Sequence, residues 1–115
     1  MILLIGGMGF IGLHTTRSLL DAGESVVVSW YSTQRMPAFL KDEVGKRLFV
    51  ERMDVSKTFE VFDVVRRNKV DSIIDLMAPP AGGTSPHFDY HMYTTGLQNV
   101  LEAGPCIWDD AGLPG

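Results

Sequence analysis

The chain has 115 residues, 45% of them hydrophobic and 21% charged, which suffices for one domain with a core and is too short for two. The formal net charge is −4, and lysines and arginines occur singly or in pairs, so no basic stripe exists to follow a nucleic-acid backbone. No apolar run is long enough to cross a bilayer, and the single Cys106 has no partner for an internal disulfide, which favours a reducing, cytoplasmic setting.

The first elements predicted are a strand and a helix. Residues 1–5 form a short apolar run that ends at glycine, which is typical of a strand buried on both faces. Residues 10–22 have helical spacing, and Gly23 is suited to end that helix. A second strand is predicted at 25–30, where valines dominate.

A second helix is predicted within residues 36–46. Pro37 is suited to the first turn, and Leu40 and Val44 would share one side of the helix. The third strand is predicted at 47–55.

The third helix is predicted to follow at 56–69. Ser56 is a candidate N-cap. Three apolar residues have helical spacing and are expected to face the core: Phe59, Phe62 and Val65.

A fourth strand at 70–78, a Pro/Gly loop and a last helix at 87–104 complete the predicted order. Strands that alternate with helices over short connections form parallel sheets covered by helices. We therefore expect an α/β fold, a truncated Rossmann-like parallel sheet with strand order 3-2-1-4 and helices on both faces. The whole chain, 1–115, is then expected to be one domain.

The segment "GGMGFIGLH", Gly6 to His14, follows the first strand and opens the first helix. It satisfies two nucleotide-binding spacings, Gly7-x-Gly9-x-x-Gly12 and Gly6-x-x-Gly9-x-x-Gly12. Glycine lets a pyrophosphate approach the main chain, and the free N–H groups of the helix N-terminus attract it. The context of strand, glycine loop and helix is the one that the motif requires.

Four segments in order resemble the N-terminal half of an extended short-chain dehydrogenase/reductase, the NAD-dependent epimerase/dehydratase family. The glycine loop is similar to that family's Thr-Gly-x-x-Gly-x-x-Gly, although Ile5 stands where the threonine is usual. "MDVS" resembles the segment beside the adenine, "IIDLMAP" the segment beside the ribose and nicotinamide, and "GLQNVLEA" the following helix. The resemblance favours the Gly6-Gly9-Gly12 register, extends to about Ala103, and leaves 104–115 as a non-family tail.

The resemblance implies a set of cofactor-binding residues in three groups. The pyrophosphate would lie on the glycine loop, the adenosine beside the ends of the second and third strands, and the nicotinamide side beside the fourth. In that order the residues are Gly6, Gly7, Gly9, Phe10, Ile11 and Gly12; Trp30, Ser32, Arg35, Asp54 and Val55; and Leu76, Met77 and Ala78.

The segment "SWYSTQR" after the second strand bears on the choice between NAD and NADP. A site for NAD usually places an acid there, about twenty residues past the glycine loop, to bind the ribose hydroxyls. No acid occurs in this segment, and Ser32 and Arg35 offer a hydrogen bond and a positive charge to a 2′-phosphate. This favours NADP over NAD; the alternative is that Arg35 is a solvated loop charge and Trp30 a packing residue.

The catalytic pair implied by the resemblance is missing. The family uses a tyrosine with a lysine four residues later, and no Tyr-x-x-x-Lys occurs in the 115 residues. We therefore expect no hydride transfer from this chain alone. His87 and His91 have helical spacing, but no third ligand is evident, and no metal site is predicted.

Three functional hypotheses follow from the sequence. The chain is the cofactor-binding part of a longer reductase or epimerase, or a nucleotide sensor without turnover, or a protein-association module. The last hypothesis rests on the predicted fourth strand, which would be an unpaired edge open to a second copy or to a missing C-terminal half. A nicotinamide dinucleotide is the expected small-molecule partner; nucleic acid and membrane are not expected.

Overall fold

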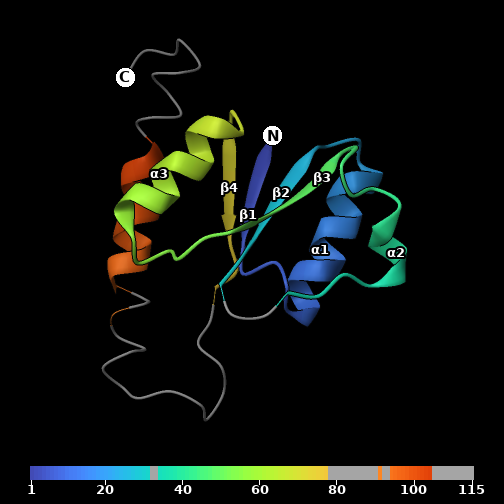
Figure 1. Cartoon of the computed structure of the whole chain (residues 1–115), viewed down its shortest axis with the longest axis horizontal. Coiled ribbons are helices and arrows are strands. Elements are labelled where there is room, and N and C mark those ends of the chain that lie inside the picture. Colours follow the sequence, from blue (N-terminus) through green and yellow to red (C-terminus); the bar gives the residue numbers. More distant parts are fainter. Residues whose placement is uncertain (32–33, 78–90, 92–93, 105–115) are drawn as a thin grey trace.

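A computed structural model describes residues 1–31, 34–77, 91 and 94–104. Its centre is a four-stranded parallel sheet in the order β3-β2-β1-β4, which confirms the predicted α/β fold and strand order (Figure 1). The strands are β1 (Ile2–Ile5), β2 (Val26–Trp30), β3 (Leu48–Arg52) and β4 (Ser72–Asp75).

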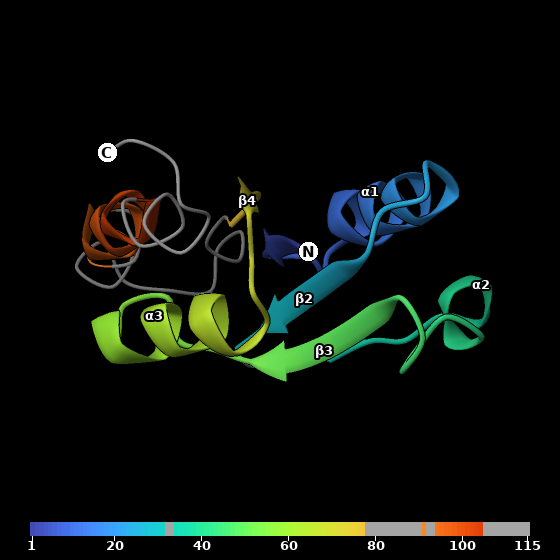
Figure 2. The ribbon, with the colours of Figure 1, turned by 90° about the horizontal axis from the view of Figure 1, so that it is seen from above.

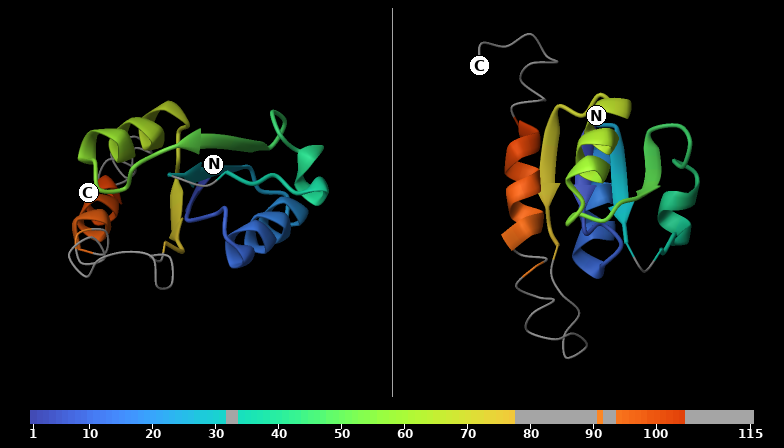
Figure 3. Two further views of the ribbon diagram at one scale, coloured as in Figure 1. Left: turned by 60° about the horizontal axis from the view of Figure 1, so that its bottom comes forward. Right: turned by 60° about the vertical axis from the view of Figure 1, so that its left-hand side comes forward.

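Helices cover both faces of the sheet, as predicted (Figures 2 and 3). They are α1 (Phe10–Asp21) and α2 (Ala38–Lys41) on one face, and α3 (Thr58–Arg67) with a helix over residues 94–104 on the other. No helix in these described ranges is long and apolar enough to span a membrane.

The two central strands are buried on both sides because their alternating side chains enter two separate cores. Leu4 and Val28 pack on the side of α1 and α2, whereas Leu3 and Val27 pack on the side of α3. Within the described sheet, β4 is hydrogen-bonded to β1 alone. Association through that edge stays a prediction.

The second helix is shorter than predicted. It ends at Lys41, and Val44 is exposed instead of lying beside Leu40 in the core. The chain turns at Gly45, which has φ +83°, and the carbonyl of Glu43 accepts backbone N–H groups from Arg47 and Leu48. The prediction was wrong here because the turn that starts β3 takes over the second half of the segment.

The third helix buries Val65 as predicted, and Phe62 packs partly buried against the same core, but the prediction for Phe59 was wrong. Phe59 is 80% exposed, and the buried residues are Val61, Val64 and Val65. The helix also begins later than predicted, with Lys57 at its N-cap. Ser56 is not the cap because its N–H and hydroxyl both bond to Asp54, at 3.0 and 2.7 Å.

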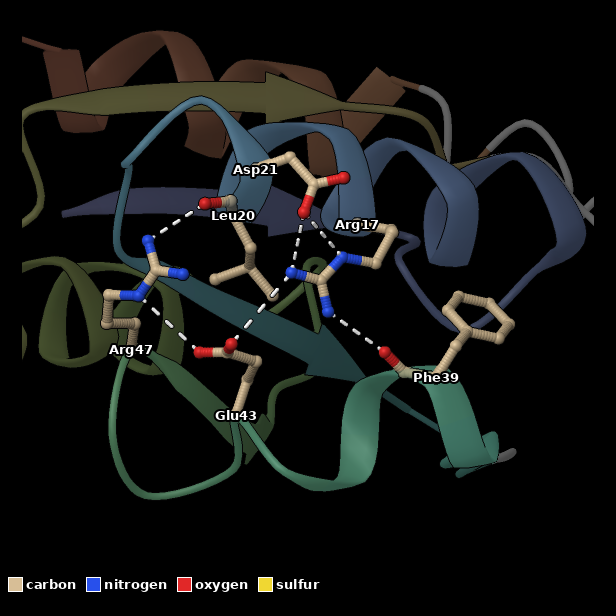
Figure 4. A network of polar contacts seen from close by, with 6 residues as sticks. All are labelled: Arg17, Leu20, Asp21, Phe39, Glu43 and Arg47. Atoms are coloured by element: carbon tan, nitrogen blue, oxygen red, sulfur yellow. Dashed lines mark hydrogen bonds and ion pairs between the residues drawn. The ribbon is translucent and has the colours of Figure 1, made fainter.

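A polar network joins α1 to α2 and the following turn (Figure 4). Arg17 donates to the carbonyl of Phe39 at 2.9 Å and lies 3.9 Å from Glu43. Arg47 approaches from the turn, donates to the carbonyl of Leu20 at 2.8 Å, and lies 3.4 Å from the same Glu43 carboxylate. The network fixes the short α2 segment and the turn after it against α1.

Candidate functional site

The glycine loop between β1 and α1 packs directly against the end of β4. Gly6 has φ +77°, a conformation that L side chains rarely adopt. A Cβ at this position would lie 2.9 Å from backbone atoms of both Leu76 and Met77. Two segments that are distant in the sequence therefore meet at the carboxyl edge of the sheet.

Close packing inside the loop requires glycine at positions 7 and 12. A Cβ on Gly7 would lie 2.4 Å from Cγ1 of Val28, and a Cβ on Gly12 would lie 2.5 Å from the Cα of Gly7. The absence of side chains at these positions lets the first turn of α1 lie on the loop and the loop lie on β2. Gly7 thus has a packing role of its own in this fold.

Gly9 has no such structural reason to be glycine. A Cβ there would have one neighbour within 4 Å in the described residues, the carbonyl oxygen of Gly6 at 4.0 Å. Its backbone angles, φ −81° and ψ 175°, are open to any residue. The described residues therefore leave the space above Gly9 open.

Gly9 is also the N-cap of α1 and supplies no side-chain hydrogen bond to the helix. The N–H groups of the first turn have no acceptor within the helix, and that turn contains no acidic residue. The Phe10 and Ile11 side chains are 77% and 68% exposed and leave this end of the helix accessible. Such an end attracts an anion.

The segment after β3 brings Asp54 and Val55 to the same edge of the sheet. Oδ1 of Asp54 is already occupied by Ser56, and the Val55 side chain is 2% exposed within the core around α3. The interpretation of Val55 as a neighbour of adenine therefore rests on its backbone. The Asp54 carboxylate keeps its second oxygen, Oδ2, which no hydrogen bond in the described residues uses.

The segment after β4 continues the pairing with β1 by one residue. Leu76 donates its N–H to the carbonyl of Ile5 at 2.9 Å, and Met77 donates its N–H to the Asp75 carboxylate at 3.0 Å. Leu76 is 36% exposed, whereas Met77 packs against the core beside Gly96. Ala78 lies outside the described residues.

The segment after β2 returns to the glycine loop. Trp30 packs on the core beneath α1 and α2, which agrees with the packing interpretation of its side chain. The backbone N–H of Arg35 lies 3.3 Å from Sδ of Met8, within the glycine loop. The Arg35 side chain is exposed there. Ser32 lies outside the described residues.

Sequence reasoning missed Asn99, which connects this edge to the helix over 94–104. The Asn99 side chain is 3% exposed; its amide donates to the carbonyl of Val55 at 2.9 Å, and its Oδ1 accepts the hydroxyl of Thr58 at 2.8 Å. The asparagine in the segment "GLQNVLEA" was the available signal, because the side-chain amide of an asparagine that becomes buried must find hydrogen-bond partners. The partners themselves lie 44 and 41 residues away in sequence.

Replacement of Asn99 by leucine is expected to lower the free energy of unfolding by about 2 kcal/mol, because the buried carbonyl of Val55 would lose its donor. Urea denaturation monitored by circular dichroism measures the loss. Gln98→Leu is the matched control, since Gln98 bonds to Glu102 on the exposed side of the same helix. An equal, small effect of both substitutions would contradict this role for Asn99.

The structure also bears on the histidines and on the acidic residues of the described part of the chain. There, no group of three His, Cys, Asp or Glu side chains is placed to hold a metal ion, and His87 lies outside that part. His14 stacks on Phe39 with ring centroids 5.3 Å apart and contacts Phe10 at 4.7 Å. The stacking on Phe39 joins α1 to α2, and the contact with Phe10 lies within α1, so the role of His14 is structural.

Comparison with solved structures identifies the same architecture in larger enzymes. The UDP-glucose 4-epimerase of Thermus thermophilus in complex with NAD has a TM-score of 0.75 at 25% identity over 92% of this chain and 34% of that one. WbmH of Bordetella bronchiseptica, in complex with NAD+, has a TM-score of 0.76 at 20% identity over 92% and 35%. An L-threonine dehydrogenase of Clostridium difficile has a TM-score of 0.71 at 24% identity over 92% and 33%. The latter two show likeness of fold alone.

Comparison of sequences finds UDP-glucose 4-epimerases among the relatives of this chain. The UDP-glucose 4-epimerase of Drosophila melanogaster is 31% identical over 114 residues, covering 89% of this chain and 33% of the relative. That of Bacillus subtilis is 33% identical over 108 residues, covering 89% and 32%. The chain thus spans about a third of the length of these relatives. A sequence model of the NAD dependent epimerase/dehydratase family matches residues 2–104, and the chain belongs to that family.

Proposed function

We propose that this chain binds a nicotinamide adenine dinucleotide at the carboxyl edge of its sheet, with the pyrophosphate above Gly9. The observation that carries the proposal is the unused space at Gly9, since Gly6, Gly7 and Gly12 are explained by the fold and Gly9 is not. A glycine without a structural reason, at the open N-terminus of α1, fits the close approach of a phosphate to the backbone.

The remaining contacts follow from where the described segments lie. The amides of Phe10 and Ile11 would donate to the pyrophosphate, Asp54 and the Val55 backbone would border the adenine, and Leu76 and Met77 would lie on the nicotinamide side. Both ends of the dinucleotide then lie along one edge of the sheet, on opposite sides of the glycine loop.

We further propose that NADP binds more tightly than NAD. No acid stands in the segment after β2 to repel a 2′-phosphate, and Arg35 is held beside the glycine loop by its backbone contact with Met8. Ser32 would add a hydrogen bond, as the sequence predicts.

The chain acts as the cofactor-binding part of an epimerase/dehydratase or reductase. Bound nicotinamide supplies hydride transfer in such enzymes. The 115 residues hold no Tyr-x-x-x-Lys to move the accompanying proton, so this chain binds the cofactor without turning it over alone. Its own residues position the dinucleotide, and the edge of β4 that is unpaired in the described sheet is where the rest of the site would join.

Calorimetric titration with NADP, NAD and ADP-ribose tests the proposal. Saturable binding of all three is expected, because they share the pyrophosphate and adenosine that the described residues would contact. NADP should be the tightest. Absence of heat or of any thermal stabilisation at millimolar nucleotide would overturn dinucleotide binding.

A further inference from the structure

The ends of β2 and β3 hold an arginine that the cofactor residues above do not include. Arg52 is the last residue of β3 and pairs in register with Trp30, the last residue of β2. The N–H of Met53 bonds to the carbonyl of Trp30 at 2.8 Å, so the two strand ends are joined beyond Arg52. Because the sheet is parallel, this is the same edge at which β1 enters the glycine loop.

The Arg52 side chain is held in place by an aromatic ring. Its guanidinium carbon lies 5.2 Å from the centroid of the Tyr31 ring, within the range of a cation–π contact. Tyr31 is the first residue after β2, and its side chain is partly exposed. The contact therefore directs the guanidinium from the end of β3 toward the chain that leaves β2.

The charge on Arg52 has no carboxylate partner among the described residues, unlike those on Arg17, Arg47 and Arg67. Its neighbour Glu51 is engaged on the opposite face of the sheet, where Arg67 lies 2.6 Å away and Asn68 also donates to it. Hydrogen bonds to Glu51 and then to Asp63 raise the pKa of Arg67 above its ordinary value. Glu51 is thus committed to α3.

A second arginine approaches from the other end of the same segment. Arg35 is fixed at its backbone by Met8 in the glycine loop, and no acid occurs between residues 31 and 41. Within the part of the chain that the structure describes, Arg35 also lacks an ion pair. One exposed guanidinium, that of Arg35, therefore belongs to the segment that begins at Tyr31, and a second, that of Arg52, lies on the first residue of that segment.

We propose that Arg52, held on the Tyr31 ring, binds the 2′-phosphate of NADP together with Arg35. The inference rests on the proposed dinucleotide site and names a specificity-determining residue for it. A planar guanidinium donates two parallel hydrogen bonds to a phosphate, and stacking on an aromatic ring leaves its N–H edge free to do so. Tyr31 is a positioning residue, because it acts through Arg52.

The test compares Arg52→Gln with the parent chain in titrations with NADP, NAD, 2′-phospho-ADP and ADP. NADP and 2′-phospho-ADP are expected to bind at least about tenfold more weakly to the variant, with NAD and ADP changed less than about twofold. Arg66→Gln is the matched control: it removes an exposed arginine from α3, on the other face of the sheet, and should leave all four affinities unchanged.

Substitutions of Tyr31 test the positioning role. Tyr31→Phe keeps the ring and should preserve the preference for the 2′-phosphate, whereas Tyr31→Leu should reduce it toward that of Arg52→Gln. The advantage of NADP should also fall as salt is raised, because the contact is partly exposed.

Each result of these titrations has one meaning. Equal losses for NAD and NADP in Arg52→Gln, or an unchanged preference, would overturn the assignment of Arg52. Equal affinities of the parent chain for NADP and NAD would overturn it as well and leave dinucleotide binding intact. Failure of the parent chain to bind any of the four nucleotides would instead overturn the proposed function.

Discussion

Gly9→Asp is expected to weaken dinucleotide binding by at least about 100-fold without destabilising the chain. A carboxylate above the N-terminus of α1 would occupy the space that a Cβ can enter freely and would repel the pyrophosphate at short range. Aspartate is a favourable N-cap, so the melting temperature should stay unchanged or rise slightly. Titration calorimetry and thermal denaturation measure the two effects on one preparation.

Gly9→Ala separates steric from electrostatic loss. The added methyl group meets no described atom of the protein closer than 4.0 Å, so a fall in affinity would arise from contact with the ligand. Gly104→Ala is the matched control, because a Cβ there meets no described atom within 4 Å and lies at the end of the helix over 94–104, away from the glycine loop. Full affinity in Gly9→Asp would show that the pyrophosphate does not lie above α1.

Gly12→Ala, unlike Gly9→Asp, is expected to destabilise the chain. The expected loss in the free energy of unfolding is about 3 kcal/mol, at the upper end of what overpacking costs. The new Cβ would lie 2.5 Å from the Cα of Gly7 and 2.7 Å from the carbonyl oxygen of Gly6. These are backbone atoms, which cannot move away by changing a rotamer, so α1 would have to shift from the loop. The loss is a large fraction of the roughly 5–15 kcal/mol typical of a domain.

Urea denaturation gives this loss as a lower midpoint at an unchanged slope. Gly104→Ala should differ from the parent chain by less than about 1 kcal/mol, since alanine is the better helix former and no clash arises. A loss below about 1 kcal/mol in Gly12→Ala would mean that the loop and the helix are not packed as described. Together, the Gly9 and Gly12 variants divide one motif into a ligand-binding position and a folding position.

The sequence by itself determined the strand order and the position of the glycine loop. The apolar run at 1–5, which ends at glycine, and the valine-rich run at 25–30 predict strands. The alternation of strands with helices allows few topologies other than parallel crossovers. The segments around Gly9, Asp54 and Met77 were predicted to meet, and the structure brings Met77 against Gly6 and both Val55 and Met77 against Gly96. These features are local in origin or follow from general rules of chain connection.

Only the tertiary structure decided that Phe59 lies outside the buried face of α3, where α2 ends, and which charges remain unpaired in the described residues. The spacing that placed Phe59 in the core is equally compatible with Val61 there, and packing against β1 and β2 selects the valines. Arg52 shows the same limit, since its contact with Tyr31 and the engagement of Glu51 by Arg67 both join residues from different elements. Such choices depend on contacts between segments distant in sequence, which local periodicity does not encode.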